Sequence, residues 1–334
     1  MANKQKNQKK KKITLYNFFN PDTHGKGISK EDVEAPRTFG RFFKFLWNNI
    51  SMLFTLNLLM VFGNFPLLIS MLGLSGNFNI PTSSAPSVLF APLYGAMQFN
   101  DSPISAALFG VHGVPVQMSI ITPTTKVLYA CGALVIFTFG LVSVGSTYIL
   151  RNMVKCEPIF FFHDFFYAIK RNFKQGMIFG IIDVLMMVLL TYDAIFFYAN
   201  ATNTLNTILL GLMLFFILVY FIMRFYVYIL IVTFDLPFKK IVKNSFILAI
   251  AGMKRNIVAV FGIIVLVAIN YFILNNIMPI GIILPFIITF AVGSFMSAYA
   301  AYPVIKKIMI DPYYSEQAKG KENDAEALSG VSEE

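Results

Sequence analysis

The sequence predicts an all-α, polytopic membrane protein with about six transmembrane helices in three hairpins, each preceded by a cytoplasmic amphipathic interfacial helix. The composition is the first observation behind this prediction, because 57% of the residues are hydrophobic and only 13% are charged. Soluble domains carry about 25% charged residues. The second observation is a series of apolar stretches of about 20 residues, the length that a helix needs to cross a bilayer. The mean hydropathy of +0.67 agrees with both.

The two ends of the chain differ from the middle. Residues 1–35 begin with the lysine-rich run "KQKNQKKKK" and are expected to form a basic, disordered cytoplasmic leader that contacts anionic lipids. Residues 36–312 make up the expected transmembrane domain. Residues 313–334 are acidic and poor in large apolar side chains, so we expect a disordered cytoplasmic tail. The net charge of +10 is concentrated at the edges of apolar segments rather than on a binding face, which argues against a nucleic-acid partner.

Six spans are expected within this middle region. In order, they cover residues 50–74, 127–150, 176–198, 207–232, 257–274 and 281–302. The connection at 75–126 is apolar but contains five prolines among its first 41 residues. It is too interrupted for another span, so we expect it to pack over the outer face, where protein can satisfy its backbone.

The basic residues predict the orientation. Eleven Lys and Arg residues precede residue 50, five lie in 151–175, five in 233–256 and four follow residue 302. The connections on the opposite side carry one, Lys126. Because cytoplasmic loops are enriched in Lys and Arg, both termini are expected to be cytoplasmic, in a plasma membrane.

The stretch "EPIFFFHDFFYAIKRNFKQG" at residues 157–176 is too charged for a span and too apolar for water. On a helical wheel its large apolar side chains share one face, namely Phe161, Phe162, Phe165, Phe166, Ile169 and Phe173. The polar side chains lie opposite, namely His163, Asp164, Lys170, Arg171 and Lys174. The pattern predicts an amphipathic helix along the inner membrane surface.

Similar segments precede the first and fifth expected spans. Each has an acid, a proline, a basic and aromatic amphipathic stretch and an asparagine, as in "RTFGRFFKFLWNN" and "FKKIVKNSFILAIAGMKRN". The tripeptide "KRN" occurs at both 170–172 and 254–256. We therefore expect three units of similar layout.

Two charges lie inside the expected spans. Asp183 is seven residues from the inner end of the third span, at a depth of about 10 Å, and Arg224 is at about 12–15 Å in the fourth span. A charge at the bilayer centre costs about 2.5–3.5 kcal/mol, so we expect the two to pair. Three interpretations remain open: a structural ion pair, part of a solute or proton pathway, or two side chains that snorkel separately.

No motif in the sequence predicts an enzyme, a metal site or a cofactor. The candidate residues are therefore the intramembrane pair Asp183 and Arg224, together with an inner-surface docking set. That set consists of Asp164, Lys170, Arg171, Lys174, Lys239, Lys240 and Lys243. Gly293, Ser297 and Ala301 form a stripe of small residues in the last span and predict close helix packing.

Three stretches resemble the YesL-like family of bacterial integral membrane proteins of unknown function. They are "GSTYILRNMVKCEPIFFFHDFFYAIKRNFKQG", "YILIVTFDLPFKKIVKNSFILAIAGMKRN" and "YPVIKKIMIDPYY". Genes of that family often accompany carbohydrate-uptake ABC transporters and glycan-degrading enzymes. The resemblance therefore implies a non-catalytic accessory or regulatory component of carbohydrate uptake, partnered by an ABC sugar permease. The alternative is a small-solute transporter or permease in its own right that uses the Asp183 and Arg224 pair.

Overall fold

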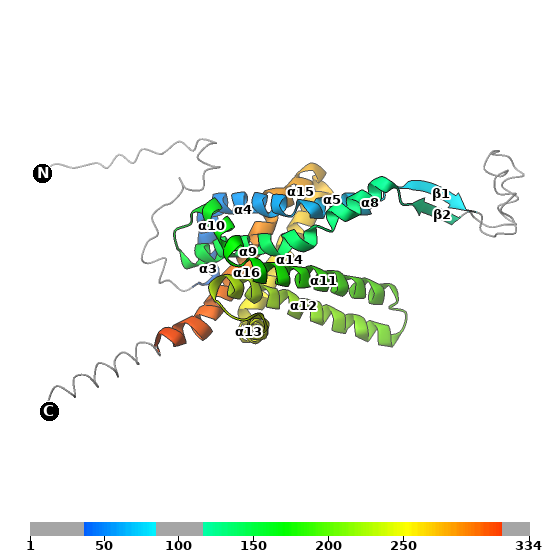
Figure 1. Cartoon of the computed structure of the whole chain (residues 1–334). Helices are drawn as coiled ribbons and strands as arrows, with labels where there is room; N and C mark the ends of the chain where they lie inside the picture. The colour runs from blue at the N-terminus through cyan, green and yellow to red at the C-terminus, as the bar shows by residue number, and fades with distance from the viewer. Residues whose placement is uncertain (1–36, 85–115, 316–334) are drawn as a thin grey trace, which may run out of the picture. The chain divides into compact units, whose positions relative to one another are not determined.

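The computed structural model describes residues 37–84 and 116–315. The predicted leader at 1–35, residues 85–115 of the outer connection and residues 316–334 of the predicted tail lie outside the described residues. The chain forms two compact units (Figure 1). Residues 64–135 make one unit, and the chain before and after them makes the other.

The third to sixth predicted spans are confirmed as long apolar helices. They are α11 (Phe173–Ala199), α12 (Thr204–Thr233), α14 (Met253–Asn276) and the helical run Met278–Ser315. This last run consists of α15 (Met278–Leu284), the π-helix η3 (Pro285–Thr289), α16 (Phe290–Ile305) and the π-helix η4 (Lys306–Ile310). Helices α11 and α12 form an antiparallel hairpin (Figure 1). Residues 313–315, predicted as tail, are still helical.

The first predicted span is not one continuous helix. Helix α4 (Ile50–Gly63) ends before Asn64, and α5 (Phe65–Leu74) begins the other compact unit. Pro66 lies in the first turn of α5, where its missing N–H group costs nothing, so it favours a new helix start at this point. The second predicted span is confirmed within the apolar helical stretch Pro123–Lys155, which consists of α8 (Pro123–Gly132) and α9 (Val135–Lys155) with a short break between them.

Five helical stretches of the described chain are long and apolar enough to cross a membrane. A sixth is obtained only if α3 (Phe39–Asn48) and α4, bent by 75° at Asn49, are counted together. Helix α4 alone has 14 residues, which cover about 21 Å, so it is shorter than the hydrocarbon core.

The unit at 64–135 adds a small sheet to the predicted all-α fold. Strand β1 (Ile80–Ser84) pairs antiparallel with β2 (Val116–Ile120), with Ile80 opposite Ile120. Helices α5 and α8 pack closely at Gly132, where a Cβ atom would overlap Ser70. Thr122 caps α8 by accepting from the Thr125 N–H group, and its hydroxyl donates to the Phe78 carbonyl at 2.7 Å. The packing of segment 75–126 over the outer face stays a prediction.

Three short helices precede α4, α11 and α14, as the three predicted units require. They are α3, α10 (Phe161–Arg171) and α13 (Phe238–Ala251). Each is separated from its span by one residue of similar backbone conformation: Asn49 (φ −107°, ψ 12°), Asn172 (φ −108°, ψ 22°) and Gly252 (φ −89°, ψ 10°). We call the end of the bundle that carries these three helices the interfacial end.

The asparagine at the first two breaks has a specific role. The amide nitrogens of Asn49 and Asn172 donate to the carbonyl four residues earlier, at 2.8 and 3.0 Å. The same two carbonyls also accept the backbone N–H groups of Asn49 and Asn172, so each side-chain amide adds a second hydrogen bond at the end of its helix. In the third unit the break falls at Gly252, so the predicted equivalence of Asn256 and Asn172 is wrong by one helical turn. Asn256 instead donates to the Ala249 carbonyl, across the break.

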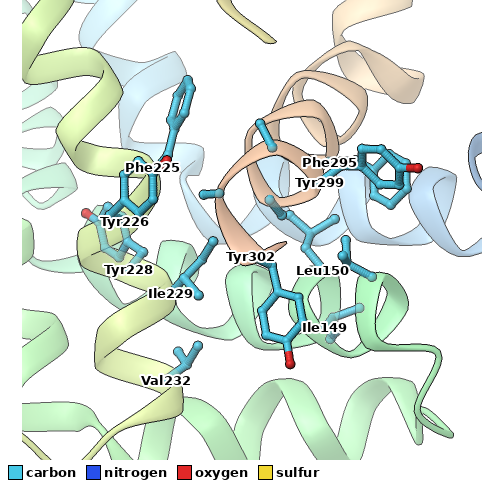
Figure 2. Packing of buried hydrophobic residues seen from close by; sticks show 14 of the residues in the cluster. Ile149, Leu150, Phe225, Tyr226, Tyr228, Ile229, Val232, Phe295, Tyr299 and Tyr302 are labelled. Carbon is cyan, nitrogen blue, oxygen red and sulfur yellow. The ribbon is translucent and has the colours of Figure 1, made fainter. Parts of the chain in front are cut away.

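The hydrophobic core lies near the interfacial end. Eight consecutive residues of α12, from Phe225 to Val232, are buried, so this part of the helix contacts protein on all sides. Figure 2 shows Ile229 and Val232 of α12 on the side of Leu150 in α9 and Tyr302 in α16, which belong to the same cluster. The half of α12 away from the interfacial end is different, because Leu214 and Phe215 are exposed. The helices are therefore packed together at one end and lipid-facing at the other.

Helices α9 and α11 cross closely at two glycines. A Cβ atom added to Gly140 would overlap Gly180, and one added to Gly180 would overlap Gly140. Gly176 lies one turn before Gly180, which gives the small-residue spacing that allows two backbones to approach. The predicted stripe at Gly293 does not serve this purpose, because a Cβ atom there would meet only Leu266, at 3.9 Å.

Candidate functional site

The two intramembrane charges meet, as their depths in the spans predict. The Arg224 Nε atom lies 2.7 Å from the Asp183 Oδ1 atom, and the Asp183 side chain is fully buried. The Nε–H group does not point along this line, so the contact is an ion pair rather than a linear hydrogen bond. Arg224 also lies over the Phe139 ring, with 5.5 Å between its Cζ atom and the ring centroid.

Two tyrosines complete the surroundings of the carboxylate. The Tyr220 hydroxyl donates to Asp183 Oδ1 at 2.8 Å, and the Tyr228 hydroxyl donates to Asp183 Oδ2 at 2.7 Å. Tyr220, Arg224 and Tyr228 follow one another at four-residue intervals, so they share one face of α12. That spacing is visible in the sequence, and it could have predicted both tyrosines as neighbours of the Arg224 and Asp183 pair.

The arrangement favours a structural role for the pair. Both carboxylate oxygens accept a hydrogen bond, and Arg224 neutralises the charge of the carboxylate. Buried charges with such complete partners are stable inside a membrane, whereas a transport site needs ligand valences left open for a solute. The guanidinium group makes one further weak contact, from Nη1 to the Met187 sulfur at 3.9 Å.

An apolar crevice lies between α12 and α14, with a volume of about 330 Å³. Its lining contains no polar side chain and consists of Leu214, Ile217, Leu218, Phe221, Val260, Ile263, Ile264 and Val267. A crevice of this composition fits hydrocarbon and offers no group that would orient a sugar or an ion.

The side chains of α10 lie in three sectors around the helix. Phe161, Phe165 and Ala168 are buried against the bundle. Phe162 and Phe166 are exposed along the next side. The remaining exposed side carries His163, Tyr167, Lys170 and Arg171. The single apolar face predicted from the wheel is therefore divided between protein contacts and an exposed aromatic strip.

Asp164 does not belong to the docking surface, contrary to the prediction that placed it on the polar face. Its side chain is buried, and its Oδ2 atom accepts from the Phe160 N–H group at 3.0 Å. Oδ1 lies 3.2 Å from His163 Nδ1. A carboxylate that binds a free N–H group in the first turn stabilises the start of a helix.

The other docking candidates are exposed on neighbouring segments. Lys174 is in the first turn of α11, while Lys239, Lys240 and Lys243 are in the first half of α13. One hydrogen bond joins these segments, from Gln175 Nε2 to the Leu236 carbonyl at 3.0 Å. The basic residues of both segments thus flank a direct contact between them.

Three arginines at the interfacial end were not predicted as a set. Arg151 Nη1 donates to the Val232 carbonyl in the last turn of α12, at 2.6 Å. Arg37 Nε and Nη2 donate to the Val154 carbonyl in the last turn of α9, at 2.9 and 2.8 Å. Both carbonyls are at helix C-termini, where a cation is favoured by the helix dipole.

Arg255, which lies in α14, likewise binds backbone carbonyls, in this case those of α16. Its Nε and Nη2 atoms donate to the carbonyls of Ala300 and Tyr299, both at 3.2 Å. Pro303 lies in α16, as do these two carbonyls, and it has no N–H group. The Tyr299 carbonyl, four residues earlier, therefore lacks its helical donor. Arg255 replaces that donor, and Nη2 also binds the Arg37 carbonyl at 2.8 Å.

The Asn57 side chain in α4 forms hydrogen bonds with backbone groups at both ends of η3. Its Nδ2 atom donates to the carbonyls of Pro285 and Phe286, at 2.8 and 2.7 Å, and its Oδ1 atom accepts from the Ala291 N–H group at 2.9 Å. The amide is thus inserted into the hydrogen-bond ladder of the last helix, which accounts for the widened π-helical turn.

Within residues 37–84 and 116–315, no three His, Cys, Asp or Glu side chains are grouped so that they could hold a metal ion.

Residues 124–194 match a family described as a protein of unknown function, DUF624. The matched segment runs from α8 into α11 and includes α10 and Asp183, but not Arg224. No curated protein and no solved structure matches the chain.

Proposed function

We propose that this protein is a non-catalytic membrane component that assists or regulates carbohydrate uptake by an ABC transporter. One observation carries the proposal: the Asp183 carboxylate is not exposed to a solute. Asp183 is fully buried and both of its oxygens accept hydrogen bonds from tyrosines, so its surroundings are supplied by the protein itself. The sugar-uptake context rests on the resemblance of "EPIFFFHDFFYAIKRNFKQG" and its neighbours to the YesL-like family.

In this proposal the transporter docks on the interfacial end. The exposed side of α10 carries Lys170 and Arg171, and Lys174 follows directly in α11. The excess of Lys and Arg on this side supports a cytoplasmic location for it and for both termini, in the plasma membrane of a bacterium. A basic surface there suits an acidic surface of the transporter, because complementary charge steers association.

Co-purification tests the proposal. The full-length protein is tagged, isolated from native membranes in mild detergent and analysed for ABC permease subunits. We expect wild type to retain a sugar permease, and the triple variant Lys170→Glu/Arg171→Glu/Lys174→Glu to lose it. The matched control Lys306→Glu/Lys307→Glu reverses exposed charges in η4 and should keep the partner. Absence of a permease from the wild-type sample contradicts the accessory role.

The second candidate function is a small-solute transporter, which the presence of an ion pair inside the spans favours. Purified protein in liposomes distinguishes the two. Sugar or proton flux by the protein alone, abolished in Asp183→Asn, would establish transport and overturn the accessory role. We expect no flux.

A further inference from the structure

The exposed side of α13 changes character along its length. Lys239, Lys243, Phe246 and Ile250 follow one another at intervals of four, three and four residues, so they form a single stripe on the helix. All four are exposed, and the opposite side of the helix is buried through Ile241 and Leu248. The stripe is cationic in its first half and apolar in its second. A parallel pair, Lys240 and Ile247, repeats this order.

The lysines lie where the helix itself disfavours them. The N-terminus of an α-helix carries a partial positive charge, and the first turn of α13 contains no acidic residue. Lys239 and Lys243 are four residues apart, a spacing at which like charges repel. Asp235 precedes the helix, yet in the described chain none of the three lysines forms an ion pair with it or with another carboxylate.

Helix α10 shows the opposite arrangement. Asp164 is in its first turn, and Lys170 and Arg171 are in its last turn, so the ends of α10 carry charges that its own dipole favours. The cations of α13 lack that compensation, although they too are on an interfacial helix. An anion supplied from outside would relieve their repulsion and complement the positive helix end.

We propose that the α13 stripe binds an anionic phospholipid from the surrounding leaflet. The phosphate of the headgroup contacts Lys239, Lys240 and Lys243, and the acyl chains lie along Phe246 and Ile250. The stripe from Lys239 to Ile250 is about 17 Å long, which is long enough for a headgroup at one end and acyl-chain contacts at the other. A soluble anion or an acidic peptide would use the lysines but not the apolar half, so the continuous stripe favours a lipid.

This inference does not depend on the proposed function, since a lipid site exists with or without a transporter partner. The test uses the full-length protein in nanodiscs that contain both phosphatidylcholine and phosphatidylglycerol, with native mass spectrometry of the lipids retained on release. We expect wild type to retain phosphatidylglycerol preferentially. We expect Lys239→Gln/Lys240→Gln/Lys243→Gln to reduce that preference about tenfold or more, because the headgroup phosphate loses its charged hydrogen-bond donors.

Two controls separate a site from diffuse surface charge. Lys170→Gln/Lys306→Gln/Lys307→Gln removes the same number of exposed charges elsewhere at the interfacial end and should keep the preference. Lys239→Arg/Lys240→Arg/Lys243→Arg keeps the charge, so this variant should also keep the preference for phosphatidylglycerol. Phe246→Gln/Ile250→Gln tests the apolar half and should lower phosphatidylglycerol retention with all lysines present.

Three results would overturn the proposal: equal losses in the two glutamine triples, no loss in either, or full retention by Phe246→Gln/Ile250→Gln. Competition by inorganic phosphate alone would identify a simple anion site instead. Removal of residues 316–334 tests the acidic tail as the occupant. If the tail rather than lipid covers the lysines, its removal raises phosphatidylglycerol retention above wild type.

Discussion

Substitution of Asp183 by asparagine tests whether the intramembrane ion pair stabilises the fold. The change keeps the shape of the side chain and removes its charge, so Arg224 loses its only ion-pair partner within the described chain. An unpaired arginine within the membrane costs about 2.5–3.5 kcal/mol. The Tyr220 and Tyr228 hydroxyls then donate to a neutral amide or lose their acceptor, and interhelical hydrogen bonds in membranes average about 0.6 kcal/mol each.

Together these terms predict a loss of roughly 3–5 kcal/mol in the free energy of unfolding, the range found when one partner of a buried pair is removed. The assay is reversible unfolding of the purified protein in mixed micelles, followed by tryptophan fluorescence from Trp47 or by circular dichroism. Asp193→Asn in the same helix is the matched control. Asp193 makes no ion pair in the described chain, so a change below about 0.5 kcal/mol is expected.

The double variant Asp183→Leu/Arg224→Leu sharpens the result. Replacing both charges removes the unpaired-charge penalty, so the double variant should be more stable than Asp183→Asn. The structural reasoning is refuted if Asp183→Asn unfolds like wild type, or if the double variant is less stable than the sum of its single changes.

Three further predictions concern backbone contacts. Gly180→Val should cost several kcal/mol and lower the amount of folded protein, because its Cβ atom would overlap Gly140 in the facing helix; thermal unfolding in detergent measures the loss. Asn57→Leu should cost about 2–4 kcal/mol in the same assay, because three buried backbone groups lose a partner. Arg255→Met should destabilise by about 1–3 kcal/mol, and adding Pro303→Ala should recover part of that loss by restoring the helical donor.

Each of these has a distinct control. Gly211→Ala introduces a Cβ atom where no other atom lies within 4 Å, so it should leave stability unchanged or slightly higher. Asn275→Leu removes an exposed asparagine that binds only the Tyr271 carbonyl of its own helix, and it should cost far less than Asn57→Leu. Failure of Pro303→Ala to recover any stability would contradict the role assigned to Arg255.

The long spans could be predicted because each is an uninterrupted apolar run whose ends are marked by charge. Helices α11, α12 and α14 extend beyond the predicted limits by only a few residues, since hydropathy locates the membrane but not the helix end. The break at Asn64 was not predicted, because the residues on both sides are as apolar as those of a continuous span. Pro66 was the local signal for it.

The candidate site was predicted in part. Asp183 and Arg224 are rare charges in apolar runs, and their equal depth predicted that they would meet. Tyr220 and Tyr228 were missed because tyrosine is common in membrane helices, so only the spacing relative to Arg224 distinguishes them. The contacts of Asn57 with η3 join residues more than 220 positions apart in the chain, and no local pattern specifies such a pairing.

The concentration of packing at the interfacial end has a consequence for how the protein responds to bilayer thickness. Helix α12 is 30 residues long, about 45 Å, whereas the hydrocarbon core measures about 30 Å. The third of α12 nearest the interfacial end is held by buried residues from Phe225 to Val232, but the opposite half has few protein neighbours. A thinner bilayer is therefore accommodated by tilt of the α11 and α12 hairpin about a fixed base, and a thicker one by its straightening. The outer tips become the part of the molecule whose position is set by the lipid.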